Sequence, residues 1–301
     1  MTKSTREFDR WNTVMKSTWT FQVFKKYNEE LNQMLWSNLG AVKSIFKTLK
    51  GTGATWSDLP SKYLTFDVPN GEEAFETLED WAEYYNKFQN WINLNGLIAI
   101  TSNFETYLAT VVTLALESDP GLLFNSSKSI DGVILLKRGA KKSIHMKDII
   151  ISVTKGDWNS RTSAFKKLFG LLPMEFESSI GELEKIRNLR NKVGHAFGRD
   201  IEASRNHEVK NTQEIEKLSN SNLKKNQRKI WGVAKSIDKF LLKNHIGEYQ
   251  AVAFYHRLYL ELNKENHQSE RAVKLKKELG KFGDISGKEF CKGLVKYYEG
   301  L

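Results

Sequence analysis

The stretch IRNLRNKVGHAFGRD at residues 186–200 contains side chains that could bind an anion and transfer a proton. On a helical wheel, Arg190 falls within a narrow arc of apolar residues. That arc is formed by Leu183, Ile186, Val193 and Phe197. An arginine in this position needs an anion or a polar partner, because an unpaired buried charge is costly. His195 follows five residues later, and histidine is the residue type that most often transfers protons in enzymes, so His195 is a candidate for proton transfer.

The spacing of these residues limits how they can act together. Asn191 and His195 are four residues apart and share one face of a helix. Arg190 and His195 are five residues apart, so on an unbroken helix they point about 140° away from each other. One ideal helix therefore cannot easily bring both to the same small group. Either the helix ends at Gly194 and turns the histidine back, or two copies of the helix pool their residues across a dimer.

The hexapeptide RNKVGH at residues 190–195 resembles the signature of the HEPN superfamily, an arginine and a polar residue with a histidine shortly after. The segment GDWNSRTSAFKKLFG and the helix after it resemble the second half of the HEPN domains of prokaryotic defence and toxin–antitoxin ribonucleases. The segment SNFETYLATVV resembles their first long helix. The resemblance covers roughly residues 80–200, and it does not extend to residues 1–70 or 201–301.

The resemblance implies a metal-independent endoribonuclease that needs no cofactor and acts as a homodimer. In that chemistry His195 would take the proton of the RNA 2′-hydroxyl, because histidine titrates near neutrality. Arg190 would hold the phosphate as negative charge develops on it. Asn191 would orient His195 or bind a phosphate oxygen. The expected products carry a 2′,3′-cyclic phosphate and a 5′-hydroxyl.

Three further cations surround the motif and are candidates for contacts with the RNA backbone: Arg187, Lys192 and Arg199. Each is explained equally well as surface charge. A structural interpretation of the motif is also open, because cationic residues near a helix C-terminus complement the helix dipole. In that case Arg190 pairs with a carboxylate such as Glu105, in a supporting role, and His195 caps the helix.

The biological role expected from the resemblance is that of a toxin or antiphage effector, with a possible antitoxin or regulatory partner. The alternative is a non-catalytic HEPN-like helical protein that binds RNA, a nucleotide or a protein partner. The composition predicts a soluble globular protein, with 40% hydrophobic and 27% charged residues among 301. Cys291 is the single cysteine, which excludes an intrachain disulfide and predicts a reducing, cytoplasmic compartment. No apolar run in the sequence approaches the roughly 20 residues that span a bilayer, so no membrane association is expected.

The net charge of +10 is unevenly distributed along the chain. Residues 1–120 contain 11 Lys and Arg against 15 Asp and Glu, whereas residues 121–200 contain 15 against 8 and residues 201–301 contain 20 against 13. This excess favours a polyanionic partner such as RNA or DNA, although a lysine-rich solvated surface explains it too. The segment LKKNQRKIWG at residues 223–232 is a second candidate for RNA contact, with a solvated helix face as the alternative. His245 and Glu248 are interpreted as a surface pair and not as metal ligands.

Apolar periodicity predicts an all-α fold, a HEPN-like helical bundle with additional N- and C-terminal helices. A helix or helix pair is expected over residues 8–49, and a helix over 75–116 that bends or breaks near Gly96. Further helices are expected over 146–154, over 159–169, and from Pro173 to Gly194 or Gly198. Four more are expected after residue 201, divided near Asn220, Gly247, Asn266 and Gly283. A short hairpin is expected around Arg138 and Gly139. The predicted regions are 1–74, a helical region and loop; 75–200, the HEPN-like core; and 201–301, a basic helical region.

Overall fold

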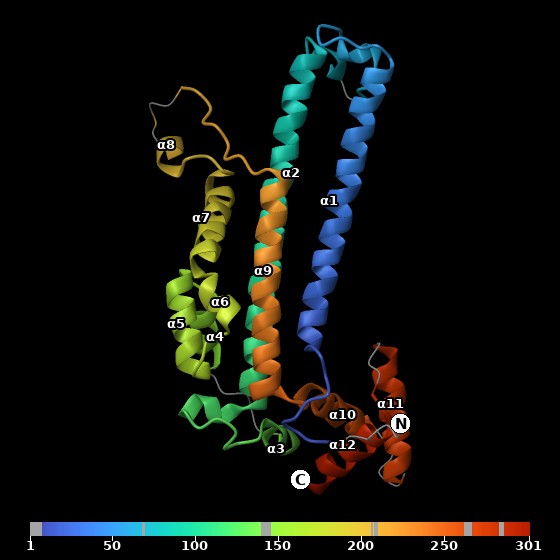
Figure 1. Cartoon of the computed structure of the whole chain (residues 1–301), viewed down its shortest axis with the longest axis vertical. Helices are drawn as coiled ribbons and strands as arrows, with labels where there is room; N and C mark the ends of the chain where they lie inside the picture. The colour runs from blue at the N-terminus through green and yellow to red at the C-terminus, as the bar shows by residue number, and fades with distance from the viewer. Residues whose placement is uncertain are drawn as a thin grey trace. The chain divides into compact units, whose positions relative to one another are not determined.

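The fold of the chain is all-α, as predicted. The computed structural model describes residues 8–67, 70–139, 146–205, 207, 210–261, 267–282 and 286–301. Within these ranges every regular element is a helix (Figure 1). The α-helices are α1 (Trp19–Gly51), α2 (Leu78–Ser118), α3 (Gly132–Lys137), α4 (Met146–Thr154), α5 (Trp158–Phe169), α6 (Met174–Ser178), α7 (Ile180–Ala196), α8 (Ile201–Arg205), α9 (Asn220–Leu241), α10 (Tyr249–Glu261), α11 (Gln268–Lys281) and α12 (Lys288–Gly300). A single turn of π-helix, Leu242–Ile246, follows α9.

Most of the helix positions predicted from periodicity are confirmed. The helices predicted at residues 146–154 and 159–169 correspond to α4 and α5. In the last hundred residues, α9 to α12 correspond to the four predicted helices, and the divisions predicted at Asn266 and Gly283 lie outside the described residues. The helix predicted to follow Pro173 is divided in two, since α6 ends at Ser178 and α7 begins at Ile180.

The hairpin predicted around Arg138 is wrong over the part of it that the structure describes. Residues Gly132–Lys137 form helix α3. Asp131 caps this helix, since its carboxylate accepts a hydrogen bond from the backbone N–H of Val133 at 3.0 Å. An aspartate at this position satisfies one of the unpaired N–H groups of the first turn and so favours the helix. Residues 140–145 lie outside the described residues.

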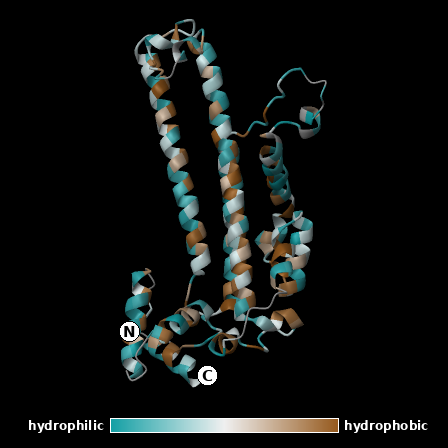
Figure 2. Cartoon of the chain, turned by 180° about the vertical axis from the view of Figure 1, so that it is seen from behind, coloured by the Kyte–Doolittle hydropathy of each residue, from teal (hydrophilic) through white to brown (hydrophobic). Residues whose placement is uncertain are grey.

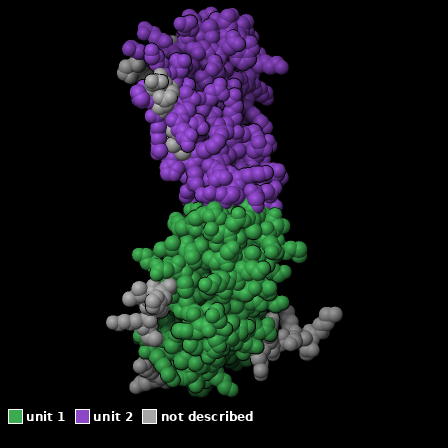
Figure 3. Space-filling model, turned by 90° about the vertical axis from the view of Figure 1, so that its left-hand side faces the viewer, with its two compact units in different colours: residues 1–23, 105–180, 232–301 green, residues 24–104, 181–231 purple. Residues whose placement is uncertain are grey.

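Contacts between residues divide the chain into two compact units, which Figure 3 colours separately. Unit 1 is formed by Met1–Val23, Glu105–Ile180 and Gly232–Leu301, and unit 2 by Phe24–Phe104 and Gly181–Trp231. Both units combine stretches that are far apart in the sequence. The three consecutive regions expected from the sequence stay a prediction.

In unit 2, α1 and α9 pack side by side and run in opposite directions. Phe24 stacks on Trp231 with the ring centroids 6.0 Å apart. Asn32 Oδ1 accepts a hydrogen bond from Gln227 Nε2 at 2.8 Å. The paired residue numbers rise along α1 as they fall along α9, so the two helices are antiparallel.

Helix α2 continues through Gly96, so of the two predicted alternatives, a bend or a break, the break is wrong and the bend stays a prediction. A Cβ atom at position 96 would lie 3.2 Å from Leu223 Cδ2 and 3.7 Å from Leu35 Cδ2. A glycine inside a helix costs about 1 kcal/mol relative to alanine. Here it lets side chains of α1 and α9 approach the backbone of α2 closely, and this packing offsets that cost.

Figure 2, which colours the chain by hydropathy, shows many apolar residues along the long helices. Helix α2 is rich in apolar residues from position 94 to its end. Among the described residues, α2 is the one helix long and apolar enough to cross a membrane by length and composition, which the sequence-based expectation did not anticipate. Its most apolar window has a mean hydropathy of 1.3 and is 39% buried inside the protein. From position 94 to the end of α2 the buried apolar residues are Leu94, Leu97, Ile100, Phe104, Tyr107, Leu108, Val111, Val112, Ala115 and Leu116. A helix buried in this way also fits a protein core, so its composition is weak evidence for a membrane.

Candidate functional site

The motif at residues 190–195 lies in the last turns of α7, which belong to unit 2. One of the two alternatives required the helix to end at Gly194. The helix instead continues through Ala196. Its end comes where Phe197 and Gly198 adopt positive φ angles of 53° and 78°. The N–H of Gly198 then donates to the carbonyl of Lys192 at 3.0 Å. His195 is therefore still on the helix and is not turned back toward Arg190.

Arg190 lies on the buried stripe of α7, as predicted. Its neighbours Leu183, Ile186 and Val193 are 1%, 5% and 2% exposed. Arg190 itself is half-buried, and its Nη1 atom donates a hydrogen bond to Asn191 Oδ1 at 3.1 Å. The guanidinium therefore has a polar partner within the motif, which orients it.

His195 is exposed, in contrast to the arginine. Within the described part of the chain, its side chain forms no hydrogen bond or ion pair. Because α7 is continuous from Arg190 to His195, the two side chains diverge by about 140° around the helix. A single chain does not bring them to one point. A histidine in the last turn also complements the helix dipole, so this part of the structural interpretation stays open.

The three flanking cations all have partners in the protein. Arg187 pairs with Glu184 across one helical turn, with Nη2 and Oε1 2.5 Å apart. Lys192 Nζ lies 2.5 Å from Glu216 Oε1, and this hydrogen bond raises the pKa of the lysine. Arg199 donates from Nε to the carbonyl of Gln213 at 3.2 Å.

These partners do not prevent the three cations from contacting RNA. Exposed ion pairs contribute little to stability, and RNA phosphates compete for them. Glu105, the predicted supporting carboxylate, forms an ion pair with Arg161 at 3.2 Å in unit 1. Its supporting role at the motif stays a prediction.

A segment without regular structure, residues 213–218, holds the C-terminal end of α7 in place; we call it the strap. Its Glu216 N–H donates to the carbonyl of Gly198 at 2.7 Å. The side-chain amide of Asn90 on α2 binds the strap twice, donating to the Glu216 carbonyl at 2.9 Å and accepting from the Leu218 N–H at 2.8 Å. Together these bonds fix the backbone just beyond His195. The sequence contains no local signal for this strap.

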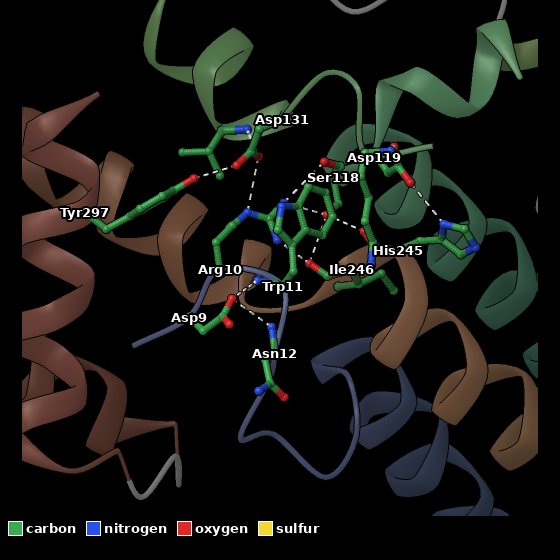
Figure 4. A network of polar contacts seen from close by, with 12 residues as sticks. Asp9, Arg10, Trp11, Asn12, Ser118, Asp119, Asp131, His245, Ile246 and Tyr297 are labelled. Carbon is green, nitrogen blue, oxygen red and sulfur yellow. Dashed lines mark hydrogen bonds and ion pairs between the residues drawn. The ribbon is translucent and has the colours of Figure 1, made fainter. Parts of the chain in front are cut away.

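A buried polar network in unit 1 was not predicted (Figure 4). Its centre is Arg10, which is 4% exposed and lies 3.2 Å from the Asp131 carboxylate. The same guanidinium donates to the carbonyl of Ile246 at 2.7 Å and to Ser118 Oγ at 2.7 Å. Burial lowers the pKa of Arg10, and the charge of Asp131 opposes that shift. These contacts stabilise a buried cation, so we interpret the network as a structural site.

The interpretation of His245 and Glu248 as a surface pair is wrong, because both are buried in this network. His245 Nδ1 lies 3.0 Å from the carboxylate of Asp119, a residue 126 positions away. Ser127 Oγ donates to the same carboxylate at 2.6 Å. Burial alone would raise the pKa of Asp119, but hydrogen bonds from His245, Ser127 and Lys128 hold that pKa below its usual range.

The network has the residue types of a nucleophilic triad but not the geometry of one. A catalytic serine and a carboxylate bind opposite nitrogens of the histidine ring. Here Ser127 Oγ and Asp119 Oδ2 both face Nδ1, at 3.4 Å and 3.0 Å. The part of the chain that the structure describes also has no group of three or more His, Cys, Asp or Glu side chains that could hold a metal ion.

The chain has no significant match among protein-family models, curated proteins or solved structures. An all-α fold hosts many unrelated functions, so the fold class alone does not identify this one. The function therefore has to be argued from the residues of α7 and their geometry.

Proposed function

We propose that the chain is a metal-independent HEPN-type endoribonuclease that acts as a homodimer. One observation carries the proposal: α7 is unbroken through the motif, with a half-buried Arg190 fixed by Asn191 and an exposed His195 turned away from it. One chain then presents each half of a site without completing it. A second copy of α7 supplies the missing half, which is the dimer that the sequence analysis left open.

In this mechanism His195 of one protomer takes the proton from the RNA 2′-hydroxyl. The freed 2′-oxygen attacks the neighbouring phosphorus, and the bond from phosphorus to the 5′-oxygen breaks. The leaving 5′-oxygen takes up a proton, and the product ends are a 2′,3′-cyclic phosphate and a 5′-hydroxyl. Arg190 of the other protomer stabilises the charge that develops on the phosphoryl oxygens, because a guanidinium matches their geometry.

Asn191 has a positioning role in this mechanism. Its Oδ1 atom accepts the hydrogen bond from Arg190, which leaves the Nδ2 group of the same amide to bind a phosphate oxygen. The interaction also limits the rotamers of the arginine before RNA binds. A pre-organised cation loses less conformational entropy when it binds the phosphate.

The proposed biological role is that of a toxin or antiphage effector with cytoplasmic RNA as its substrate and an antitoxin or regulatory partner as its control. Residues 121–200 and 201–301 each contain more Lys and Arg than Asp and Glu, which supports an RNA partner, since a net positive field attracts a polyanion. Arg187, Lys192 and Arg199 would then exchange their protein partners for backbone phosphates.

The test is cleavage of end-labelled RNA by the purified protein, with and without EDTA. We expect cleavage to be insensitive to EDTA and to be lost in Arg190→Ala and in His195→Ala. His207→Ala is the matched control, because His207 is an exposed histidine outside the motif. Equal cleavage by the wild type and both motif variants would reject the proposal.

The second candidate is a non-catalytic HEPN-like protein that binds RNA, a nucleotide or a protein partner. The exposed His195 supports it, because no hydrogen bond from described residues sets the tautomer of the ring, as an orienting group does for catalytic histidines. RNA binding by the wild type without cleavage, in the presence of a dimer, would favour this candidate.

A further inference from the structure

A groove runs between α1 and α9 in unit 2. Its volume is about 460 Å³, which falls within the range of small-ligand sites. Three cations, two tryptophans, three side-chain amides and one carboxylate line it. On each helix the lining residues follow the i, i+3, i+4, i+7 pattern, so each helix contributes one continuous face.

The two tryptophans of the groove lie near its opposite ends. Trp36 of α1 is 58% exposed, although an indole ring usually buries most of its surface. Trp231 of α9 is half-buried and has one face stacked on Phe24, with an angle of 16° between the rings. Positions 24 and 36 of α1 are separated by about 18 Å along the helix, which is long enough for a short run of nucleotides.

Asn28 is the buried member of the groove, at 5% exposure. Its Nδ2 group donates to the carbonyl of Phe24 at 2.9 Å, and this bond fixes which end of the amide is the oxygen. The Oδ1 atom is buried and accepts no hydrogen bond from the described residues. A buried acceptor without a donor is unfavourable, so this atom indicates a ligand that supplies an N–H group.

The charges of the groove favour an anionic ligand. Lys25 is partly neutralised by Glu29, at 3.5 Å across one helical turn. Lys224 and Arg228 have no ion pair with any residue in the described ranges, and both are exposed. Two cations without carboxylate partners at the edge of an aromatic groove can hold phosphates while bases stack on the rings.

We infer that this groove binds a short unpaired segment of RNA, an inference that rests on the proposed function in which RNA is the substrate. A base stacks on the exposed ring of Trp36, the ring of Trp231 lines the other end of the groove, and Lys224 and Arg228 bind the backbone. On α1, Asn28 lies between Phe24, which stacks on Trp231, and Trp36. Its Oδ1 atom accepts a hydrogen bond from the edge of a base. The groove thus selects single-stranded RNA at a place separate from the motif of α7.

A second copy of this chain fits the groove less well. The groove carries more cations than carboxylates, and the whole chain has a net charge of +10, so a second copy would bring like charges together. A duplex also fits poorly, because its bases are already stacked and paired.

The experiment measures binding separately from cleavage. A short fluorescein-labelled oligonucleotide of 2′-O-methyl RNA lacks the attacking hydroxyl and stays intact, so its fluorescence anisotropy reports binding by the full-length chain. We expect Trp36→Ala to weaken binding by about 5-fold or more, as the loss of one stacked base does. The matched control is Trp56→Ala, because Trp56 is 57% exposed in the same unit and lies outside the groove. This control should bind as the wild type does.

The charged residues give a second readout. Lys224→Ala and Arg228→Ala should each reduce the slope of log affinity against log salt by about 0.7, the value for one phosphate contact to a single strand. Lys43→Ala removes an exposed lysine of α1 outside the groove and should leave the slope unchanged. A double-stranded probe of the same sequence should bind more weakly than the single strand, and Trp36→Ala should not weaken it further.

The outcomes separate this inference from the proposed function. Weaker binding by the groove variants, together with wild-type binding by Trp56→Ala and Lys43→Ala, supports the groove even if no RNA is ever cleaved. Wild-type affinity and salt slope in Trp36→Ala, Lys224→Ala and Arg228→Ala would overturn it even if the motif proves catalytic, and would point to an acidic protein as the ligand. Circular dichroism of each variant checks that the helices remain folded.

Discussion

The two units place an arginine and a histidine in opposite environments. The pair is Arg10 and His245 in unit 1, and Arg190 and His195 in unit 2. In unit 1, Arg10 and His245 are 4% and 6% exposed, and each lies against a carboxylate. In unit 2, Arg190 is half-buried against an uncharged amide, and His195 is exposed. Removing the counterion of a buried charge destabilises the fold, whereas a cation that is partly exposed can still bind a ligand. The difference in environment, and not the residue types, separates a structural site from a candidate catalytic one.

The largest expected effect is on catalysis in unit 2. Removing a general base or a charge-stabilising arginine reduces cleavage by roughly 10²- to 10⁴-fold. We therefore expect His195→Ala and Arg190→Ala each to lower the cleavage rate by that factor and to leave the melting temperature close to that of the wild type. Rates of RNA cleavage and thermal unfolding of the same samples measure both. A large loss of thermal stability in His195→Ala would place that histidine with His245, as a structural residue.

The next effect is on stability in unit 1. Arg10→Ala leaves the buried carboxylate of Asp131 without its cation, and breaking a buried pair in this way costs about 3–5 kcal/mol. Urea denaturation followed by circular dichroism gives the free energy of unfolding. Arg190→Ala is the matched control and should change this free energy far less. Similar values for the two variants would remove the contrast between the two arginines.

A mixing experiment tests whether the site in unit 2 is shared between two chains. Arg190→Ala and His195→Ala are each expected to lose almost all activity, but a mixed dimer has one site with an intact arginine and an intact histidine. Random exchange of subunits should therefore restore about one quarter of the wild-type activity. If each site were built from one chain, mixing would restore no activity. Light scattering on the same samples reports whether the dimer forms.

The smallest effect is on the pH dependence of stability. Hydrogen bonds from His245, Ser127 and Lys128 outweigh burial and keep the pKa of Asp119 below its ordinary value of 3.8. The stability that the ionised carboxylate contributes is therefore present above that pH and is lost as the pH falls through the lower pKa of the folded state. Asp119→Asn should flatten the fall in the free energy of unfolding below about pH 4. If the free energy of unfolding of Asp119→Asn fell with decreasing pH as it does in the wild type, Asp119 would not contribute to that fall.

Much of the fold was predictable from local patterns, and the exceptions have physical causes. The positions of α4 and α5 follow from apolar periodicity within each segment. The predicted break at Gly96 failed, because side chains of Leu35 and Leu223 fill the space that a Cβ would need. No pattern around residue 96 contains that information.

The burial of the residues around Arg190 was predictable from the sequence, but the geometry of the candidate site was not. The wheel arc correctly placed Arg190 among buried neighbours, since helical periodicity alone determines which residues share a face. The direction of the His195 side chain relative to Arg190 depends on where α7 ends. That end is set beyond Gly194 by the conformations of Phe197 and Gly198 and by the bond from Glu216 of the strap.

The sequence by itself determined the all-α class, the stripe that contains Arg190 and the basic character of the later segments, because these depend on spacing and composition. Tertiary structure alone decided that His245 is buried against Asp119 and that Trp36 and Trp231 line one groove. These pairs join residues more than a hundred positions apart. Their contacts arise from the packing of helices that are distant in the sequence. The local pattern of apolar residues does not determine which distant helix packs against a given face.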